Sequence, residues 1–395
     1  MRPECGNAQA WLPVDKMLIV ILFVFVCSLM FLFLGHLAYQ FVHVSWSDFV
    51  TWMGWGGLIS LHFFVCFCLV FKALEAILLQ RFHSTAGQAF CLPENIKRQP
   101  KGNRHPYLPY GVITGLLAAS ITLTCHGMTQ ALKLPGVKEV VIHINDLSPD
   151  LEGLRIVQIT DLHATSSMRP ERVEQIVERV NAIEPEVIVL TGDIVDGSFT
   201  EINGVVAPLA RLRSRLGRFF VTGNHEYLHN ADKWTREMEA LGFTVLFNEY
   251  RLIHLNKSVL LVGGIPDPRG DSNRPDPAKA AGTADQADVK ILLAHRPDTI
   301  YDAAPEGFDI QLSGHTHGGQ VGLLSLLRKV TQPFQSGLYH FKDVAVYVSN
   351  GTGYWGIPLR FGAPSEIAHI ELTGNKKGSK AVVVDNSRFR IRGGW

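Results

Sequence analysis

The stretch LRIVQITDLH, residues 154–163, decides the fold of this 395-residue chain. Its first seven residues are mostly apolar and β-branched, which predicts a buried strand, and a carboxylate and an imidazole follow directly. The same pattern of an apolar strand followed by polar groups recurs downstream, with strands expected at 186–191, 218–222, 289–294 and 308–313. Two more strands are expected at 344–349 and 366–372.

Helical patterns separate these strands. Between the first two strands, apolar residues recur at helical spacing, with Pro170 at the start and Pro185 after the end. A second helix is expected at 232–241. The alternation of strand and helix predicts an α/β domain with a largely buried sheet. The segment 266–288 is rich in Pro, Ala and Asp, so we expect an exposed loop or lid there.

Groups that bind metals follow five of the predicted strands. Because ligands of α/β sheets bind beyond the carboxyl ends of strands, we expect these groups to share one cavity. An apolar core would not tolerate so many unpaired charges, whereas a metal cluster neutralises them. Mixed carboxylate, amide and imidazole donors suit Mn, Fe or Zn. The donors are Asp161, His163, Asp193, Asn224, His295, His315 and His317.

Each of these motifs is weak when taken alone. A single histidine such as His295 is more often a satisfied core residue than a ligand. Asp196 precedes Gly197 and fits an ordinary turn. Glu226 is interpreted as a surface or capping residue. The prediction of a metal site therefore depends on all five blocks occurring in order, each after an apolar strand.

The first third of the chain has the composition of a membrane region. Three uncharged apolar runs predict transmembrane helices at about 17–39, 49–71 and 107–130, within a membrane region spanning residues 1–133. The first run is longer than the apolar part of a cleaved signal peptide. The third contains glycine, threonine and histidine, so an interfacial or core helix remains the alternative for it.

The distribution of positive charge predicts the orientation. Six Lys and Arg residues lie in residues 72–105, and none lies between the first two predicted spans, so residues 72–105 are expected in the cytoplasm. Three crossings then place everything after Lys133 on the extracytoplasmic or lumenal side, in a multi-pass protein. Two glycosylation sequons, which begin at Asn256 and Asn350, fit that side. The basic tail 374–395 is expected to be solvated or to contact anionic lipid.

Composition excludes several classes of protein. The 37 Lys and Arg residues balance 36 Asp and Glu residues, so no nucleic-acid partner is expected, and a membrane nuclease is disfavoured. All six cysteines precede residue 126, which excludes a disulfide scaffold for the rest of the chain. The apolar first third of the chain makes a lipid bilayer the expected partner.

The five blocks, in the order D-x-H, G-D-x-x-D, G-N-H-E, H and G-H-x-H, resemble the calcineurin-like metallophosphoesterase superfamily over residues 138–373. The expected architecture is N-terminal transmembrane helices, from the apolar runs, followed by an α/β metallophosphoesterase domain, which the resemblance implies to be a four-layer α/β/β/α sandwich. The resemblance also implies a metal-dependent phosphoric ester hydrolase. The substrate, a monoester or a diester, stays open, and membrane anchoring favours a membrane-linked phosphoester. The alternative function is a non-catalytic metal-binding scaffold of the same fold.

The resemblance further implies a role for each residue. Two divalent ions about 3.5–4 Å apart would share a hydroxide that attacks phosphorus. Asp161, His163 and His317 would hold one ion; Asn224, His295 and His315 would hold the other; Asp193 would bridge both. His225 would stabilise developing charge or protonate the leaving oxygen, and Asp196 would hold the His225 ring.

Overall fold

The computed structural model describes residues 57, 59–71, 110–270, 274–283, 287–320 and 332–374. The chain divides into two compact units, Met1–His126 and Gly127–Trp395, and each is described by itself. The predicted span 17–39 and the tail after residue 374 lie outside the described residues. Of the predicted span 49–71, the structure describes a short apolar helix at Ile59–Phe71.

Helix α3 (Tyr110–Leu132) occupies the place of the third predicted span. Among the described residues, Gly111–Leu132 is the one helix long and apolar enough to cross a membrane, and only 17% of its most apolar stretch is buried. The hydroxyls of Ser120, Thr122 and Thr124 each donate to the carbonyl four residues earlier, at 2.7, 2.9 and 2.8 Å. These polar side chains are therefore satisfied inside the helix. The crossing itself stays a prediction.

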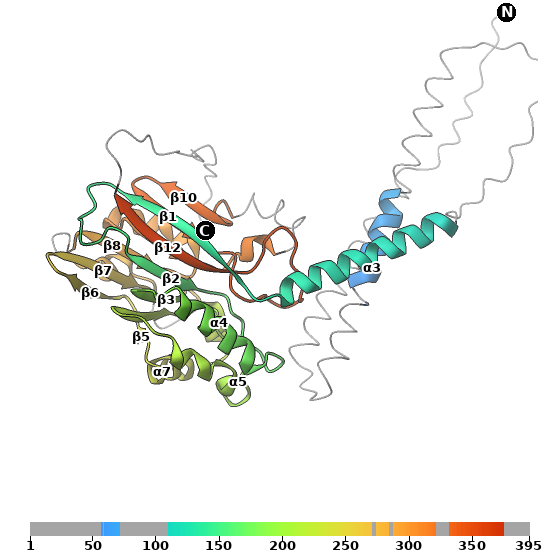
Figure 1. Cartoon of the computed structure of the whole chain (residues 1–395), viewed down its shortest axis with the longest axis horizontal. Coiled ribbons are helices and arrows are strands. Elements are labelled where there is room, and N and C mark those ends of the chain that lie inside the picture. The colour runs from blue at the N-terminus through green and yellow to red at the C-terminus, as the bar shows by residue number, and fades with distance from the viewer. Residues whose placement is uncertain are drawn as a thin grey trace, which may run out of the picture. The chain divides into compact units, whose positions relative to one another are not determined.

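The first sheet of the second unit, sheet A, has six strands in the order β1-β12-β2-β3-β4-β5. All neighbouring strands in it are parallel except β12 and β2. Helices α4 (Pro170–Ala182), α5 (Phe199–Val206) and α7 (Ala231–Ala240) lie along its outer face (Figure 1). The strands are β1 (Gly136–Ile144), β12 (Glu366–Gly374), β2 (Arg155–Ile159), β3 (Val187–Thr191), β4 (Gly217–Val221) and β5 (Thr244–Val245).

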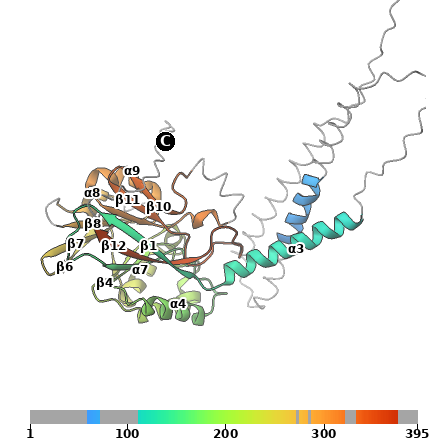
Figure 2. The same ribbon diagram turned by 45° about the horizontal axis from the view of Figure 1, so that its top comes forward.

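The second sheet, sheet C, also has six strands, in the order β10-β11-β9-β8-β7-β6. It is mixed, because its central strands are parallel and each edge is an antiparallel hairpin. Helices α8 (Pro277–Ala281) and α9 (Ile300–Ala303) lie beside it (Figure 2). The strands are β10 (Gly337–Phe341), β11 (Val344–Val348), β9 (Ile310–Ser313), β8 (Val289–Leu293), β7 (Ser258–Gly264) and β6 (Glu249–Leu255).

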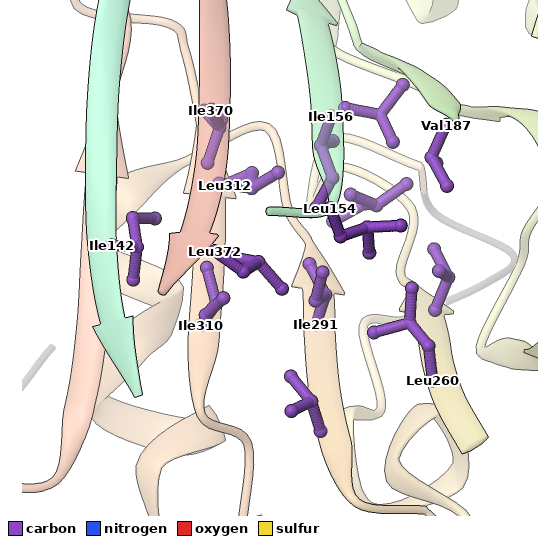
Figure 3. Close-up of a cluster of buried hydrophobic side chains, with 14 of the residues drawn as sticks. Ile142, Leu154, Ile156, Val187, Leu260, Ile291, Ile310, Leu312, Ile370 and Leu372 are labelled. Carbon is purple, nitrogen blue, oxygen red and sulfur yellow. The ribbon is translucent and has the colours of Figure 1, made fainter. Parts of the chain in front are cut away.

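The main core lies between the two sheets. Ile156 of β2 and Ile370 of β12 pack in one cluster with Ile291 of β8 and Leu312 of β9, as Figure 3 shows. Burying each such side chain stabilises the fold by about 1.5–3 kcal/mol. A second cluster packs the outer face of sheet A under its helices, and a third packs α8 and α9 against sheet C. The arrangement has the four layers that the resemblance implied.

Three features differ from the sequence-based expectations. The sequence analysis did not predict β1, β5, β6, β7 or β10, and the domain has two sheets where the strand pattern indicated one. The segment 266–288 is not simply an exposed loop, because α8 lies within it and buries Ala280 and Ala281. The side chain of Asp276 caps this helix by accepting from Lys279 N.

Short 3-10 turns complete the fold at Ala207–Arg211, Pro297–Thr299, Ala304–Glu306 and His317–Gly319.

Candidate metal centre and active site

Seven side chains with metal-binding atoms converge at the carboxyl ends of strands from both sheets. Sheet A supplies Asp161 and His163 after β2, Asp193 after β3, and Asn224 at the start of α6 (Asn224–Leu228), after β4. Sheet C supplies His295 after β8, with His315 and His317 after β9. Six of the seven are buried and His315 is half-buried. All seven predicted ligands therefore lie at the same end of the two sheets.

The distances divide these side chains into two groups. In the first, His317 Nε2 lies 3.0 Å from His163 Nε2 and 3.4 Å from Asp161 Oδ1. In the second, His295 Nε2 lies 3.1 Å from Asp193 Oδ2 and 3.2 Å from His315 Nδ1. The first group contains the three residues predicted for one ion, and the second joins two of the residues predicted for the other ion to the predicted bridge Asp193.

Asp193 lies between the two groups. Its Oδ2 is 3.1 Å from His295 Nε2 in one group and 3.9 Å from His163 Nε2 in the other. A carboxylate that bridges two cations needs this position. His295 is oriented by its Nδ1, which lies 2.8 Å from Thr191 O and donates to it, so that its Nε2 lone pair faces the centre.

The donor set fits divalent cations. Asn224 Oδ1 is buried and has no hydrogen-bond partner among the residues that the structure describes. Leaving a buried acceptor unpaired costs about 1–3 kcal/mol, and a cation removes that cost. The close approach of the His163 and His317 ring nitrogens also suits two lone pairs directed at one ion. Oxygen and imidazole donors in this mixture are typical of Mn, Fe and Zn sites.

The backbone carries strain at these positions. Five of the seven residues have positive φ angles, at 51° for Asp161, 47° for His163, 52° for Asp193, 69° for His315 and 52° for His317. Such a conformation costs a non-glycine residue about 1–3 kcal/mol, and strained residues cluster at functional sites. The fold therefore holds these side chains where local preference alone would not.

Glu226 corrects one interpretation of the sequence. It is completely buried, so it is not a surface residue, although it does cap backbone groups. Its carboxylate accepts hydrogen bonds from the backbone N–H groups of Gly223 and Asp193, at 2.6 and 2.9 Å. It also accepts from Ile194 at 2.8 Å. One side chain thus joins the loops that carry Asn224 and Asp193.

The predicted pair of His225 and Asp196 is in contact. His225 Nδ1 lies 3.0 Å from Asp196 Oδ1, and His225 N donates to Asp193 Oδ1 at 2.8 Å. Burial opposes the charged form of His225, but the Asp196 carboxylate raises its pKa above the ordinary value. Since Nδ1 faces Asp196, Nε2 is the ring nitrogen that can serve a substrate. The simple turn interpretation of Asp196 does not account for these contacts.

Sequence reasoning missed His229. Its Nε2 lies 3.1 Å from the same oxygen of Asp196, so one carboxylate holds two imidazoles. Burial opposes ionisation of Asp196, but hydrogen bonds from His225 and His229, together with the His163 ring 3.6 Å away, keep the pKa of Asp196 well below the ordinary value. The i, i+4 spacing of His225 and His229, which places both rings on one face of a helical turn, would have been the available signal.

A loop after β11, residues 350–363, closes one side of the centre and contains two further residues that the sequence did not reveal. Arg360 is 1% exposed and donates to the carbonyls of Asn350, Gly353 and Ala363, at 2.8, 3.0 and 2.7 Å. Trp355 packs edge-on to His225, with 6.3 Å between ring centroids.

Gln320 fixes this loop to the end of the His315–His317 motif. Its Nε2 donates to Trp355 O and its Oε1 accepts from Trp355 N, both at 2.9 Å. The backbone carbonyl of Gln320 also accepts from Phe361 N at 2.8 Å. The position of Trp355 beside His225 is therefore set by hydrogen bonds at its own backbone.

The two predicted glycosylation sites differ in access. Asn256 lies exposed in the turn between β6 and β7. Asn350 is buried, and its amide donates to Glu366 Oε2 at 3.1 Å while its oxygen accepts from Ser336 Oγ at 2.6 Å. The folded domain therefore does not present Asn350 for modification, and only the Asn256 sequon remains.

Comparisons with known proteins agree with this geometry. The family model described as calcineurin-like phosphoesterase matches residues 154–319, which contain all seven donors. A Helicobacter pylori protein named an uncharacterized metallophosphoesterase is 38% identical over 65% of this chain and 69% of its own length. The chain belongs to the calcineurin-like metallophosphoesterase family.

Other metallophosphoesterases match more of the chain or carry a more specific name. A Caenorhabditis elegans protein named as a metallophosphoesterase is 30% identical over 87% of this chain and 73% of its own length. A Danio rerio relative, named a transmembrane protein with metallophosphoesterase domain, is 34% identical over 65% of this chain. The match spans 62% of that relative. Membership in the metallophosphoesterases indicates metal-dependent hydrolysis of phosphoric esters.

Proposed function

We propose that this chain is a membrane-anchored phosphoesterase that holds two divalent ions, Mn, Fe or Zn, and hydrolyses a phosphomonoester or phosphodiester. The observation that carries the proposal is the meeting of seven donor side chains from five strand ends, with the buried Asn224 Oδ1 lacking a partner among the described residues. Helix α3 and the relative named a transmembrane protein support the anchoring.

Each residue has a distinct task in the proposed reaction. Divalent ions bound there would lower the pKa of water and neutralise the phosphoryl oxygens. Asp193 would hold both ions, and Asn224 would bind through a neutral oxygen that keeps the site positive. His225, with Nδ1 bonded to Asp196, would hold a proton at Nε2 and donate it to the leaving oxygen.

The His225–Asp196 pair favours catalysis over the alternative of a metal-binding scaffold. Neither residue is needed to hold a cation in either group of ligands. The Asp196 carboxylate, 3.0 Å from His225 Nδ1, stabilises the protonated ring that a general acid requires.

The test uses the full chain in detergent, stripped of metal and reloaded with Mn²⁺ or Zn²⁺. Metal content is measured by elemental analysis. Hydrolysis is measured with an aryl phosphodiester and with the matching monoester as substrates. Asp193→Asn should bind less metal and lose turnover by about 100-fold or more. Asp302→Asn, on the exposed face of α9, is the matched control and should behave as wild type.

The outcomes separate the two functions. Metal-dependent turnover that Asp193→Asn abolishes would establish the hydrolase, and the ratio of diester to monoester rates would define the substrate class. Two bound ions without turnover on either ester would favour the scaffold. Turnover that is unchanged in Asp193→Asn would contradict the bridging role.

A further inference from the structure

The sheet topology places the end of α3 at the same edge as the metal ligands. Three residues separate Leu132 from Gly136, the first residue of β1. Strand β1 is parallel to β12, with Gly136 opposite Glu366, and β12 is antiparallel to β2. The amino end of β1 and the carboxyl end of β2 therefore lie at one edge of sheet A. Asp161 and His163 follow β2 at that edge.

The carboxyl-terminal part of α3 is also hydrogen-bonded to the loop that borders the site. Arg360 N donates to Gly127 O at 3.0 Å. A Cβ atom at Gly127 would lie within 2.7 Å of Leu359 and Phe361, so the helix and the loop are in close contact. From the same loop, Gly353 N donates to Asp161 O at 2.9 Å. A short chain of direct contacts thus connects the end of α3 to a predicted ligand.

Basic side chains surround the end of α3. Arg172 of α4 donates to the carbonyls of Leu132 and Lys133, and Arg179 donates to Pro135 O at 2.7 Å. The bond to Leu132 O satisfies a carbonyl that the helix end leaves open, and the other two hold the segment between α3 and β1. Lys133 itself is exposed. The two exposed cations of this group, Lys133 and Arg179, suit the headgroups of anionic lipids.

Exposed apolar side chains lie at the same edge. Trp355, whose ring contacts His225, is 38% exposed, and Leu132 at the end of α3 is 43% exposed. Leu228, three residues after His225, is 45% exposed. Tryptophan and leucine next to basic residues are typical of surfaces that meet a water–lipid interface. The border of the site has the composition of a membrane-contacting surface.

We propose that the active-site edge of the domain faces the bilayer and that its substrate is a phosphoester carried by a lipid. The inference rests on the proposed function and on α3 as a membrane span. Three residues extend over at most about 10 Å, so a helix that ends at the membrane surface leaves this edge next to the headgroups. A lipid phosphate can then reach the centre while its acyl chains stay in the bilayer.

The decisive experiment compares substrates with the same reacting group. The full chain, reloaded with metal in phosphatidylcholine nanodiscs, is given the p-nitrophenyl phosphodiester of dioleoylglycerol or methyl p-nitrophenyl phosphate. The monoester pair is dioleoyl phosphatidate and glycerol 3-phosphate. The lipid member of at least one pair should react about 10-fold faster at equal bulk concentration, because the membrane raises its effective concentration at the site.

The other outcomes show whether the lipid substrate alone or the proposed hydrolase function as well is wrong. Soluble members that react as fast as the lipids, or faster, would overturn the lipid substrate and leave the hydrolase intact. Release of no product from any of the four esters, with two metal ions bound, would overturn the proposed function and this inference with it.

A second measurement tests the orientation without enzymatic activity. Phosphatidylcholine brominated near the headgroup quenches tryptophan that lies at the interface. Trp355→Phe should reduce the quenched fraction of the fluorescence, whereas Trp234→Phe should not. Trp234 is fully buried in the cluster that packs the outer face of sheet A under its helices. Equal quenching in wild type and Trp355→Phe would overturn the membrane-facing edge.

Discussion

Glu226 Oε2 lies 2.9 Å from the backbone nitrogen of Asp193, so a fully buried carboxylate holds the loop of the proposed bridging ligand. The same side chain accepts from Gly223 N at 2.6 Å, at the start of the loop that presents Asn224. The spacing between the two ligand loops therefore depends on an acid that binds no metal in the proposed centre.

Replacing Glu226 should damage both stability and metal binding. Glu226→Ala leaves several buried N–H groups without an acceptor, which should lower the free energy of unfolding by about 2–5 kcal/mol. Glu226→Gln keeps one oxygen acceptor, so it should lose less stability and less bound metal than Glu226→Ala. Thermal unfolding and elemental analysis of the full chain in detergent would measure both effects. The exposed Glu178→Gln is the control, and a stable, metal-replete Glu226→Ala would refute the role.

His225→Ala should keep its metal and lose turnover. The His225 side chain is not a ligand of either ion in the proposed centre, so metal binding should persist. Loss of a general acid, in contrast, costs about 100- to 10,000-fold in rate. Elemental analysis and turnover with an aryl phosphodiester, measured on one sample, would separate the two effects. Loss of metal in this variant would show that His225 is a ligand.

Asp196→Asn should narrow the active pH range from the alkaline side. The Asp196 carboxylate raises the pKa of His225, so the protonated ring persists to higher pH in the wild type. Without that negative charge, burial favours the neutral ring, and the proton is lost at lower pH. The alkaline limb of the kcat profile should therefore shift to lower pH. An unshifted limb beside reduced turnover would indicate a purely structural role.

Gly314→Ala should disrupt the centre selectively. A methyl group at Gly314 would overlap the Asp161 carboxylate and the Thr160 hydroxyl, which are both buried. We expect weakened metal binding and a destabilisation of about 1–3 kcal/mol from overpacking. Gly204→Ala in α5 is the matched control, because a methyl group added there would meet no atom of the described residues within 4 Å. That change should be neutral or stabilising by about 0.4–1 kcal/mol.

Expression in a cell that glycosylates secreted domains would test the predicted side of the membrane. If the domain lies on the lumenal side, a single glycan is expected at Asn256, and Asn256→Gln should remove the endoglycosidase-sensitive mass shift. The buried Asn350 should carry none. A second shift that persists in Asn256→Gln would contradict the burial of Asn350, and no shift in wild type would argue against the lumenal side.

The strand ends could be predicted because two simple rules coincide there. Apolar runs give the strands, and parallel strands bring the residues that follow them to one edge. The left-handed backbone of Asp161 and His163 does not follow from the apolar run that precedes them, and only the structure shows it. The structure thus explains how the fold presents donors that the sequence only names.

Glu226 and Arg360 could not be found from sequence patterns, because no local spacing reveals that they are buried. Glu226 accepts from Asp193 N of another loop, and Arg360 donates to carbonyls three to ten residues away in its own loop. The β6–β7 hairpin was missed for another reason, because the burial along β6 alternates only in part. Its turn at Asn256 lacks the glycine that usually marks a two-residue hairpin.

The order of strands in sheet A has a consequence for synthesis of the protein. Strand β12 lies between β1 and β2, and its contact with β1 joins residues 230 positions apart in the chain. The sheet therefore cannot close until the ribosome has passed residue 374, and loops that hold the ligands stay unsupported until then. Contacts so distant in sequence slow folding. A nascent chain would have to keep its apolar strands from aggregating throughout that interval.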